Sequence, residues 1–137
     1  MADDELLVAD RLVLWLEDIG FERTSATESV IFDNVGFSLT RKDFIVSISR
    51  DRGDWFISLG GAGTVSGEIG QWIACLENRP ADLAPLSLVE LGRLLKEHLN
   101  AFEELAKRPG LRECLKSRGI ERSEALMAQI RSRGEPK

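Results

Sequence analysis

The sequence has no tyrosine, a single histidine and two cysteines among its 137 residues. General acid–base catalysis uses histidine more often than any other side chain, and here a histidine-dependent triad would rest on His98 alone. No residue at a recognisable spacing supplies a catalytic partner for His98, so a structural histidine is the favoured interpretation. The missing groups indicate a protein that is not an enzyme and that uses no cofactor.

Long apolar runs are missing too. The longest, residues 13–16, is far shorter than the roughly 20 residues that a membrane-spanning helix needs. The N-terminus is acidic, which is atypical of a secretory signal. Cys75 and Cys114 lie far apart in the sequence and match no metal-ligand spacing. Two free thiols are a plainer interpretation than a disulfide, and we expect a cytoplasmic protein with no membrane partner and no metal.

What the sequence does contain is an uneven distribution of charge around a net value of −5 and a pI of about 5.0. Residues 1–106 hold 19 acidic and 9 basic residues, a net charge of −10, whereas residues 107–137 hold 4 acidic and 9 basic residues, a net charge of +5. A solvated basic helix explains such a run, and two patches that steer different partners are the alternative. No basic stripe alternates with aromatic residues, which argues against nucleic-acid binding.

Residues 28–60 alternate between apolar and polar side chains, as strands do. The pattern predicts four runs, at 28–32, 37–41, 43–50 and 55–59, joined by turns at 33–36, 41–42 and 51–54. These loop lengths place Phe32 opposite Phe37, Leu39 opposite Phe44 and Ile48 opposite Ile57. All the large apolar residues then share one face, which a slip of one residue would disrupt: Val30, Phe32, Phe37, Leu39, Phe44, Val46, Ile48, Trp55, Ile57 and Leu59.

Helical spacing surrounds this meander. It predicts a helix over residues 1–20, and helices over 87–133 that begin at a capping box of Ser87 and Glu90. Gly119 is expected to separate a short helix from a last one. Residues 60–85 combine a glycine-rich loop with an ambiguous segment, 71–76, which fits a fifth strand or a short helix. The whole is one α+β domain: an N-terminal helix, a four- to five-stranded antiparallel meander, and C-terminal helices packed on one sheet face.

Candidate binding residues lie at the predicted turns and on the other, hydroxyl-rich face of the sheet. Aspartate is common in turns, and a metal site would need convergent ligands that separate hairpins do not supply. The functional alternative is an acidic rim for a basic partner protein, with apolar anchors on the adjacent face. Trp72 either caps the sheet edge or is an exposed anchor. The candidates are Asp33, Asp43, Asp51, Asp54, Ile31, Ile45, Phe56 and Trp72.

The order of elements and one motif resemble bacterial immunity-type proteins, which are encoded beside polymorphic or contact-dependent toxins. The motif is DRGDWFISL at residues 51–59 with the glycine-rich loop after it, and the likeness covers residues 20–76. It implies a protein-binding module that neutralises a toxin domain by covering a basic site. An acidic secretion chaperone, which would be a dimer around an extended segment, and a small enzyme are the alternatives. A homo-oligomer is compatible with each.

Overall fold

A computed structural model of the chain describes residues 2–29, 34–51, 53–61, 66–81 and 86–134. Within these residues it confirms the α+β class, with an N-terminal helix, an antiparallel sheet and C-terminal helices. The elements are α1 (Ala2–Asp18), β1 (Glu22–Ser29), β2 (Asn34–Arg41), β3 (Phe44–Asp51), β4 (Asp54–Gly60), β5 (Ser66–Glu68), α2 (Ile69–Glu77), α3 (Leu88–Leu105) and α4 (Leu111–Gly134).

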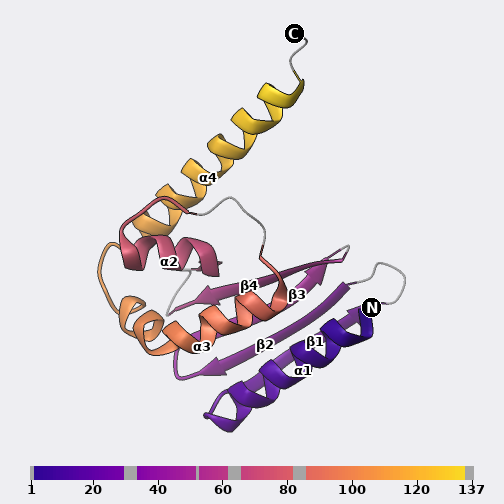
Figure 1. Cartoon of the computed structure of the whole chain (residues 1–137). Coiled ribbons are helices and arrows are strands. Elements are labelled where there is room, and N and C mark those ends of the chain that lie inside the picture. The colour runs from indigo at the N-terminus through magenta and orange to yellow at the C-terminus, as the bar shows by residue number, and fades with distance from the viewer. Residues whose placement is uncertain (1, 30–33, 52, 62–65, 82–85, 135–137) are drawn as a thin grey trace.

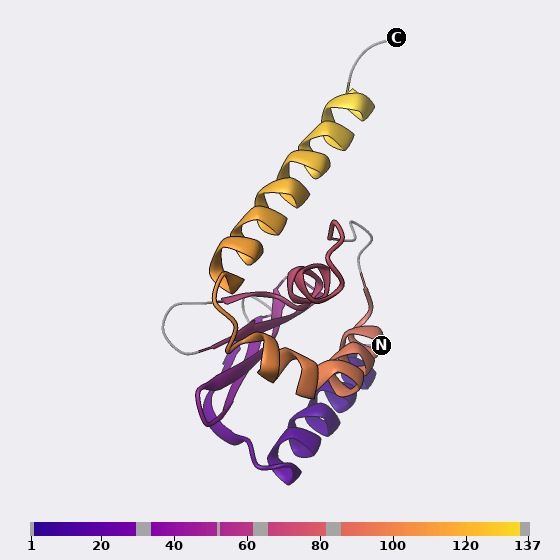
Figure 2. The ribbon, with the colours of Figure 1, turned by 90° about the vertical axis from the view of Figure 1, so that its left-hand side faces the viewer.

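The sheet has the order β1-β2-β3-β4-β5, with every neighbouring pair antiparallel. Helices α1, α2 and α3 lie against one of its faces (Figure 1). Figure 2 shows the molecule turned by 90°, with these three helices on one side of the sheet and the other side open. Helix α4 begins beside α2 and β5 and then extends away from the body. The fold therefore has a helix-covered face, an open face and a projecting helix.

The core lies between the sheet and the covering helices. The strand side chains that face the helices are the predicted apolar set, and those that the structure describes are buried or half-buried. Burying an apolar side chain of this size contributes about 1.5–3 kcal/mol, so this face accounts for much of the driving force for folding. The buried members are Leu39, Phe44, Val46, Ile48, Trp55, Ile57 and Leu59 from the strands, with Leu12, Val13, Leu16, Leu91, Leu95, Leu99 and Phe102 from α1 and α3.

The register of the β3–β4 hairpin is as predicted, with Ile48 opposite Ile57. The β2–β3 hairpin differs, because Leu39 lies opposite Val46 rather than Phe44. A shift of two residues keeps every side chain on its predicted face, since side chains alternate with period two. The face assignment was thus correct although one predicted turn was misplaced.

The predicted first strand is wrong. Strand β1 spans Glu22–Ser29 and places Ala26 opposite Phe37, and residues 34–36 belong to β2 rather than to a turn. The sequence ERTSATES carries no apolar alternation, because an edge strand gains its stability from the hydrogen-bonded ladder rather than from a buried face. Val30, Ile31 and Phe32, which the prediction used, lie outside the described residues.

The helical predictions hold in part. Ser87 and Glu90 form the predicted capping box: the Ser87 hydroxyl accepts from the Glu90 N–H, and the Glu90 carboxylate accepts from the Ser87 N–H. Residues 71–76 lie within α2. The predicted break at Gly119 is wrong, because α4 is continuous through it. A Cβ at this position would lie 3.0 Å from the Gln71 amide nitrogen, so glycine serves here as a close-approach residue.

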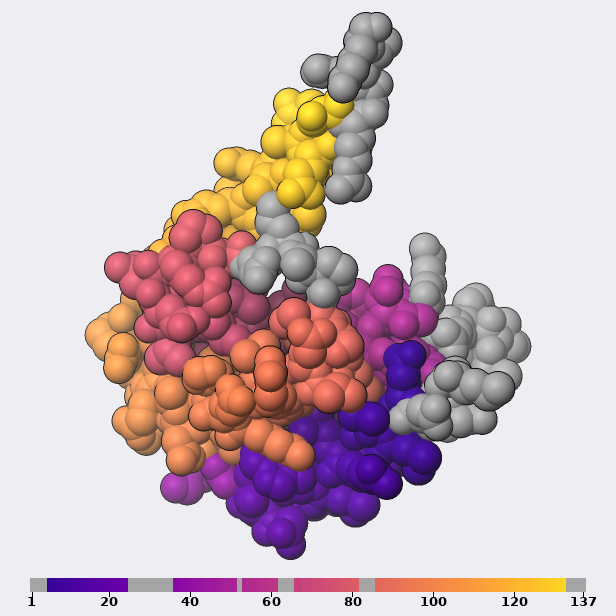
Figure 3. All heavy atoms as spheres, viewed as in Figure 1, coloured from indigo at the N-terminus to yellow at the C-terminus, as the bar shows by residue number. Residues whose placement is uncertain are grey.

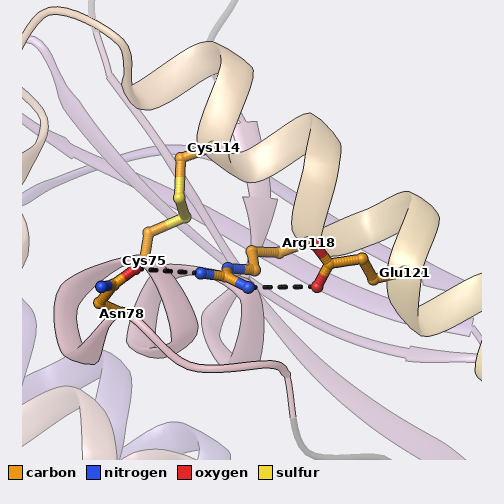
Figure 4. The surroundings of a disulfide bond; sticks show 5 residues. All are labelled: Cys75, Asn78, Cys114, Arg118 and Glu121. Carbon is orange, nitrogen blue, oxygen red and sulfur yellow. Dashed lines mark hydrogen bonds and ion pairs between the residues drawn. A yellow bond between two sulfur atoms is a disulfide. The ribbon is translucent and has the colours of Figure 1, made fainter.

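A disulfide joins Cys75 of α2 to Cys114 of α4, and the prediction of two free thiols is wrong (Figure 4). The cysteines are 39 residues apart in sequence, but α2 and α4 pack together and bring their Cα atoms to 6.1 Å. One turn further along α4, Arg118 donates to the Asn78 side-chain oxygen at 3.3 Å and to Glu121 at 3.1 Å. The first turns of α4 are therefore held to the body by covalent and polar contacts.

Candidate functional site

Hydroxyl groups occupy the centre of the open sheet face. Ser38, Ser47 and Ser58 lie directly opposite one another on β2, β3 and β4, and Glu68 of β5 continues the row. The hydroxyls of Ser38 and Ser47 are 3.3 Å apart and share a hydrogen bond. All three serines are half-buried, so the centre of the face is polar and partly accessible to solvent. Such a surface suits contact with another macromolecule better than enclosure of a small substrate.

The charged side chains at open-face positions are acidic. Pairing places Glu22 beside Thr40 on β1 and β2, and Glu68 beside Ser58, so the two edges of the face each end on a glutamate. Asp51 and Asp54 form the last pair of the β3–β4 ladder before the turn. The neighbouring pair on the same face is Ser49 with Phe56. Among the strand side chains that the structure describes, no lysine or arginine occupies an open-face position.

The basic strand residues point to the helix side instead. Arg23 pairs with Glu17 of α1 at 3.1 Å. Arg41 donates to the Ile19 carbonyl at 2.7 Å, forms an ion pair with Glu103 of α3, and lies over the Phe21 ring. The guanidinium of Arg50 lies 5.4 Å from the centre of the Trp55 ring. The fold thus directs Arg23, Arg41 and Arg50 to the helix side, where they are used in packing. Open-face positions hold the acidic residues Glu22, Asp51, Asp54 and Glu68.

Two of the predicted apolar anchors are on this face. Ile45 and Phe56 are 38% and 37% exposed, respectively. Ile45 pairs with Gly60, which is four residues from Phe56 along β4, so the two side chains are about 13 Å apart along the sheet. They lie on opposite sides of the serine row and do not form a single apolar patch.

The predicted aspartates do not form one rim. Asp51 and Asp54 lie together at one end of the sheet, whereas Asp43 lies in the β2–β3 turn at the opposite end. All three are exposed. Asp33 and Ile31 lie outside the described residues. The acidic surface is therefore the open face and the β3–β4 end of the sheet rather than a ring of turns.

Trp72 is not an exposed anchor, and this candidate is wrong. Its side chain is fully buried in α2, and the indole N–H donates to the Leu59 carbonyl at 3.2 Å. The rings of Phe44 and Phe102 pack edge-on against it, with centres 5.7 and 6.1 Å away. The sequence placed Trp72 in an uncertain segment. The segment forms helix α2, whose apolar side packs on the sheet, and Trp72 lies on that side.

Glu22 and Glu68 were missed by the sequence reasoning. Glu68 belongs to β5, which lies where the sequence predicted the end of the glycine-rich loop, and Glu22 to a strand whose start was predicted six residues too late. Both could have been found from strand register, because each pairs with a hydroxyl residue of the predicted open face. His98 lies on α3 with its ring centre 5.8 Å from that of Phe102. Among the described residues, no group of three or more histidine, cysteine or acidic side chains is arranged to hold a metal ion.

Comparison with known proteins finds no matching family model, no matching curated protein and no matching solved structure. No helix in the described part of the chain combines the length and apolar character needed to cross a membrane. The function must therefore be inferred from the geometry and charge of the open face itself.

Proposed function

We propose that this chain is a non-enzymatic protein-binding module, an immunity protein that neutralises a toxin domain by covering the toxin's basic site with the open face of its sheet. The observation that carries the proposal is the placement of the strand arginines away from the open face. The arginines Arg23, Arg41 and Arg50 face the helices, while the acidic side chains border an uncovered, hydroxyl-rich surface. A surface of one sign attracts a partner of the opposite sign and rejects partners of its own sign.

The size of the face fits part of a protein interface. Four strands of seven or eight residues and a fifth of three, spaced about 4.8 Å apart, present of the order of 500 Å², whereas a standard interface buries about 800 Å² on each partner. The contact must then extend beyond the strands. The β3–β4 end, with Asp51 and Asp54, is the adjoining acidic surface. Ile45 and Phe56 supply the apolar contacts that a polar surface alone would lack.

The test is neutralisation of a toxin encoded beside this chain, with one arginine placed on each of two surfaces. Ser47→Arg introduces bulk and positive charge at the centre of the open face. Asn100→Arg introduces the same side chain on the exposed side of α3. We expect cells to be protected by the wild type and by Asn100→Arg, and to lose protection with Ser47→Arg. Equal protection by both folded variants would exclude the open face as the binding surface.

Neutralising Asp51 and Asp54 should slow partner association. The double variant Asp51→Asn and Asp54→Asn removes two negative charges from the β3–β4 end without changing side-chain size. Electrostatic steering raises association rates by 10- to 1,000-fold overall, so we expect these two charges to account for roughly 3- to 10-fold at low salt. Association rates measured by stopped flow at several salt concentrations would also show a shallower salt dependence.

The matched control is Asp10→Asn with Asp18→Asn, which removes the same charge from the exposed outer side of α1. This control should change the association rate much less than the Asp51 and Asp54 variant. Identical association rates and salt dependences in the wild type and both variants would show that Asp51 and Asp54 do not speed association.

An acidic secretion chaperone is the second candidate function. The exposed apolar side chains of α4 favour it, because they form a surface on which two copies can pair. Such chaperones are dimers that bind an extended segment of their partner. Limited proteolysis of a captured partner separates the two functions. A folded, protease-resistant domain supports the immunity function, whereas a segment that stays extended supports the chaperone.

The cytoplasmic location remains a prediction. The disulfide removes the argument that rested on free thiols, because structural disulfides persist mainly in oxidising compartments. Trapping free thiols with a maleimide reagent in intact host cells would show whether Cys75 and Cys114 are joined where the protein acts. Two rapidly labelled thiols would place the protein in a reducing compartment.

A further inference from the structure

Helix α4 extends well beyond the body that anchors it. Its first turns pack on α2 and β5 and carry the disulfide through Cys114. Its second half projects as a separate rod, which is visible both in the ribbon and in the space-filling view (Figures 2 and 3). A segment of 15 residues, 120–134, is about 22 Å long at 1.5 Å per residue. Isolated helices of this length are marginally stable in water, so the projecting half gains from a partner that covers it.

An apolar stripe runs along this projecting half. Ile120, Met127 and Ile130 are 48%, 52% and 60% exposed. Their spacings of seven and three residues repeat the first and fourth positions of a heptad, which place side chains on one side of a helix. Ser123 occupies the remaining position of this series. A stripe of this kind is the seam by which two helices pack together.

The stripe continues into a groove at the base of α4. The groove has a volume of about 540 Å³ and lies between α4 and the residues Ser66 and Gln71. Its α4 wall includes Ile120, Ser123 and Glu124, so the groove and the stripe share one side of the helix. A helix laid along the stripe would therefore reach from the projecting half into the groove.

We propose that the partner is a second copy of this chain, and that two α4 helices pack antiparallel about a two-fold axis near Met127. In this arrangement the two projecting halves lie along each other, with Ile130 of each copy beside Met127 and Glu124 of the other, and the end of each helix reaches the mouth of its partner's groove near Ile120. Each copy therefore covers the helix that the other leaves exposed. Such a contact is self-complementary, as a two-fold dimer requires.

Charge distinguishes antiparallel from parallel packing. With Met127 at the axis, Glu124 of one copy lies beside Arg131 of the other, and this pair occurs twice. Both side chains flank the seam and are exposed in the single chain. In a parallel pair, Glu124 and Arg131 would instead neighbour Gly119 and Leu126 of the partner, with no opposite charge to meet. The antiparallel form alone pairs these charges.

Mixed charge also argues against a membrane surface as the occupant. Helices that lie on membranes carry a polar face rich in lysine and arginine. Glu121 and Glu124 alternate with Arg122 and Arg131 along the projecting half. The interface between two such helices is smaller than a standard one, and we expect weak association with a dissociation constant in the micromolar range. This inference does not rest on the proposed function.

The experiment is light scattering of the full chain over a range of concentrations. We expect the wild type to convert from monomer to dimer in the micromolar range. Met127→Glu places a charge on the seam and should raise the dissociation constant at least about 10-fold, which corresponds to 1.4 kcal/mol. The matched control, Gln129→Glu, adds the same side chain on the opposite side of α4 and should dimerise as the wild type does.

Charge exchange tests the antiparallel register. Glu124→Arg and Arg131→Glu alone should each weaken the dimer, because each brings like charges together, and the double variant should restore it. Far-UV circular dichroism shows that each variant retains its helices. A wild type that stays monomeric up to about 0.5 mM would overturn the proposal, whether or not it binds lipid vesicles. Equal effects of Met127→Glu and Gln129→Glu, or a double variant as weak as the single ones, would overturn it too.

Discussion

Replacing Trp72 by alanine should lower the free energy of unfolding by about 4 kcal/mol. Large-to-small substitutions of fully buried tryptophan cost about 3–5 kcal/mol, because the lost contacts leave a cavity that closes only in part. Here the indole contacts Phe44 and Phe102 edge-on and donates a hydrogen bond to Leu59, so α2, α3 and the sheet all lose contacts together. Urea unfolding followed by circular dichroism measures the change.

The matched control is Phe56→Ala, which removes an aromatic ring from the open face, where it is 37% exposed. We expect this variant to lose less than about 1 kcal/mol, as exposed substitutions usually do, while its affinity for the partner falls. We therefore expect the two variants to have opposite signatures, with Trp72→Ala lowering stability and Phe56→Ala lowering affinity for the proposed partner. A Trp72→Ala protein as stable as the wild type would show that the indole is not in the core.

Breaking the disulfide should lower the free energy of unfolding by about 3 kcal/mol. A cross-link between residues 39 positions apart removes conformational freedom from the unfolded chain, and loops of this length give up to about 4 kcal/mol in the chain-entropy model. The double variant Cys75→Ala and Cys114→Ala is measured by urea unfolding beside the oxidised wild type. Amide exchange should rise most in the first turns of α4, because Cys114 holds them to α2.

Reduction of the wild type is the matched control, since it breaks the same bond without changing a side chain elsewhere. The reduced wild type and the alanine variant should unfold at similar urea concentrations. Adding reductant to the alanine variant should change nothing. Two free thiols in the untreated wild type, or unchanged stability after reduction, would contradict the disulfide.

The two predictions concern different links between the same elements. Trp72 and Cys75 both lie on α2, but Trp72 joins this helix to the sheet and Cys75 joins it to α4. Loss of Trp72 should weaken the whole domain. Loss of the disulfide should loosen α4 while the sheet and α3 keep their contacts. Comparing amide exchange in the two variants would separate these effects.

The parts of the fold that the sequence predicted are those with strong local signals. The first helix, the capping box of Ser87 and Glu90 and the β3–β4 hairpin each combine a spacing pattern with a start or turn residue. Strand β1 and helix α2 lack such a combination. Gly119 shows the limit most clearly, since glycine both ends helices and allows close approach, and only the position of Gln71 decides between these uses.

The open face, which we propose as the binding surface, was predicted in outline and misplaced in detail. The sequence identified the hydroxyl-rich face with Ile45 and Phe56, because alternation along a strand reveals its two sides. It grouped Asp43 with Asp51 and Asp54 in one acidic rim, although successive turns of an antiparallel meander lie at alternate ends of the sheet. Glu22 and Glu68 entered the surface only through pairing with β2 and β4.

The scarcity of histidine, tyrosine and cysteine, the acidic body with its basic C-terminal region, and the α+β class were set by the sequence alone, because composition and periodicity are local properties. Tertiary structure decided the rest. Packing brought Cys75 to Cys114, turned Trp72 inward, directed the strand arginines to the helices and left α4 projecting with its apolar side exposed. Each of these depends on which residues distant in the chain become neighbours, and no local pattern contains that information.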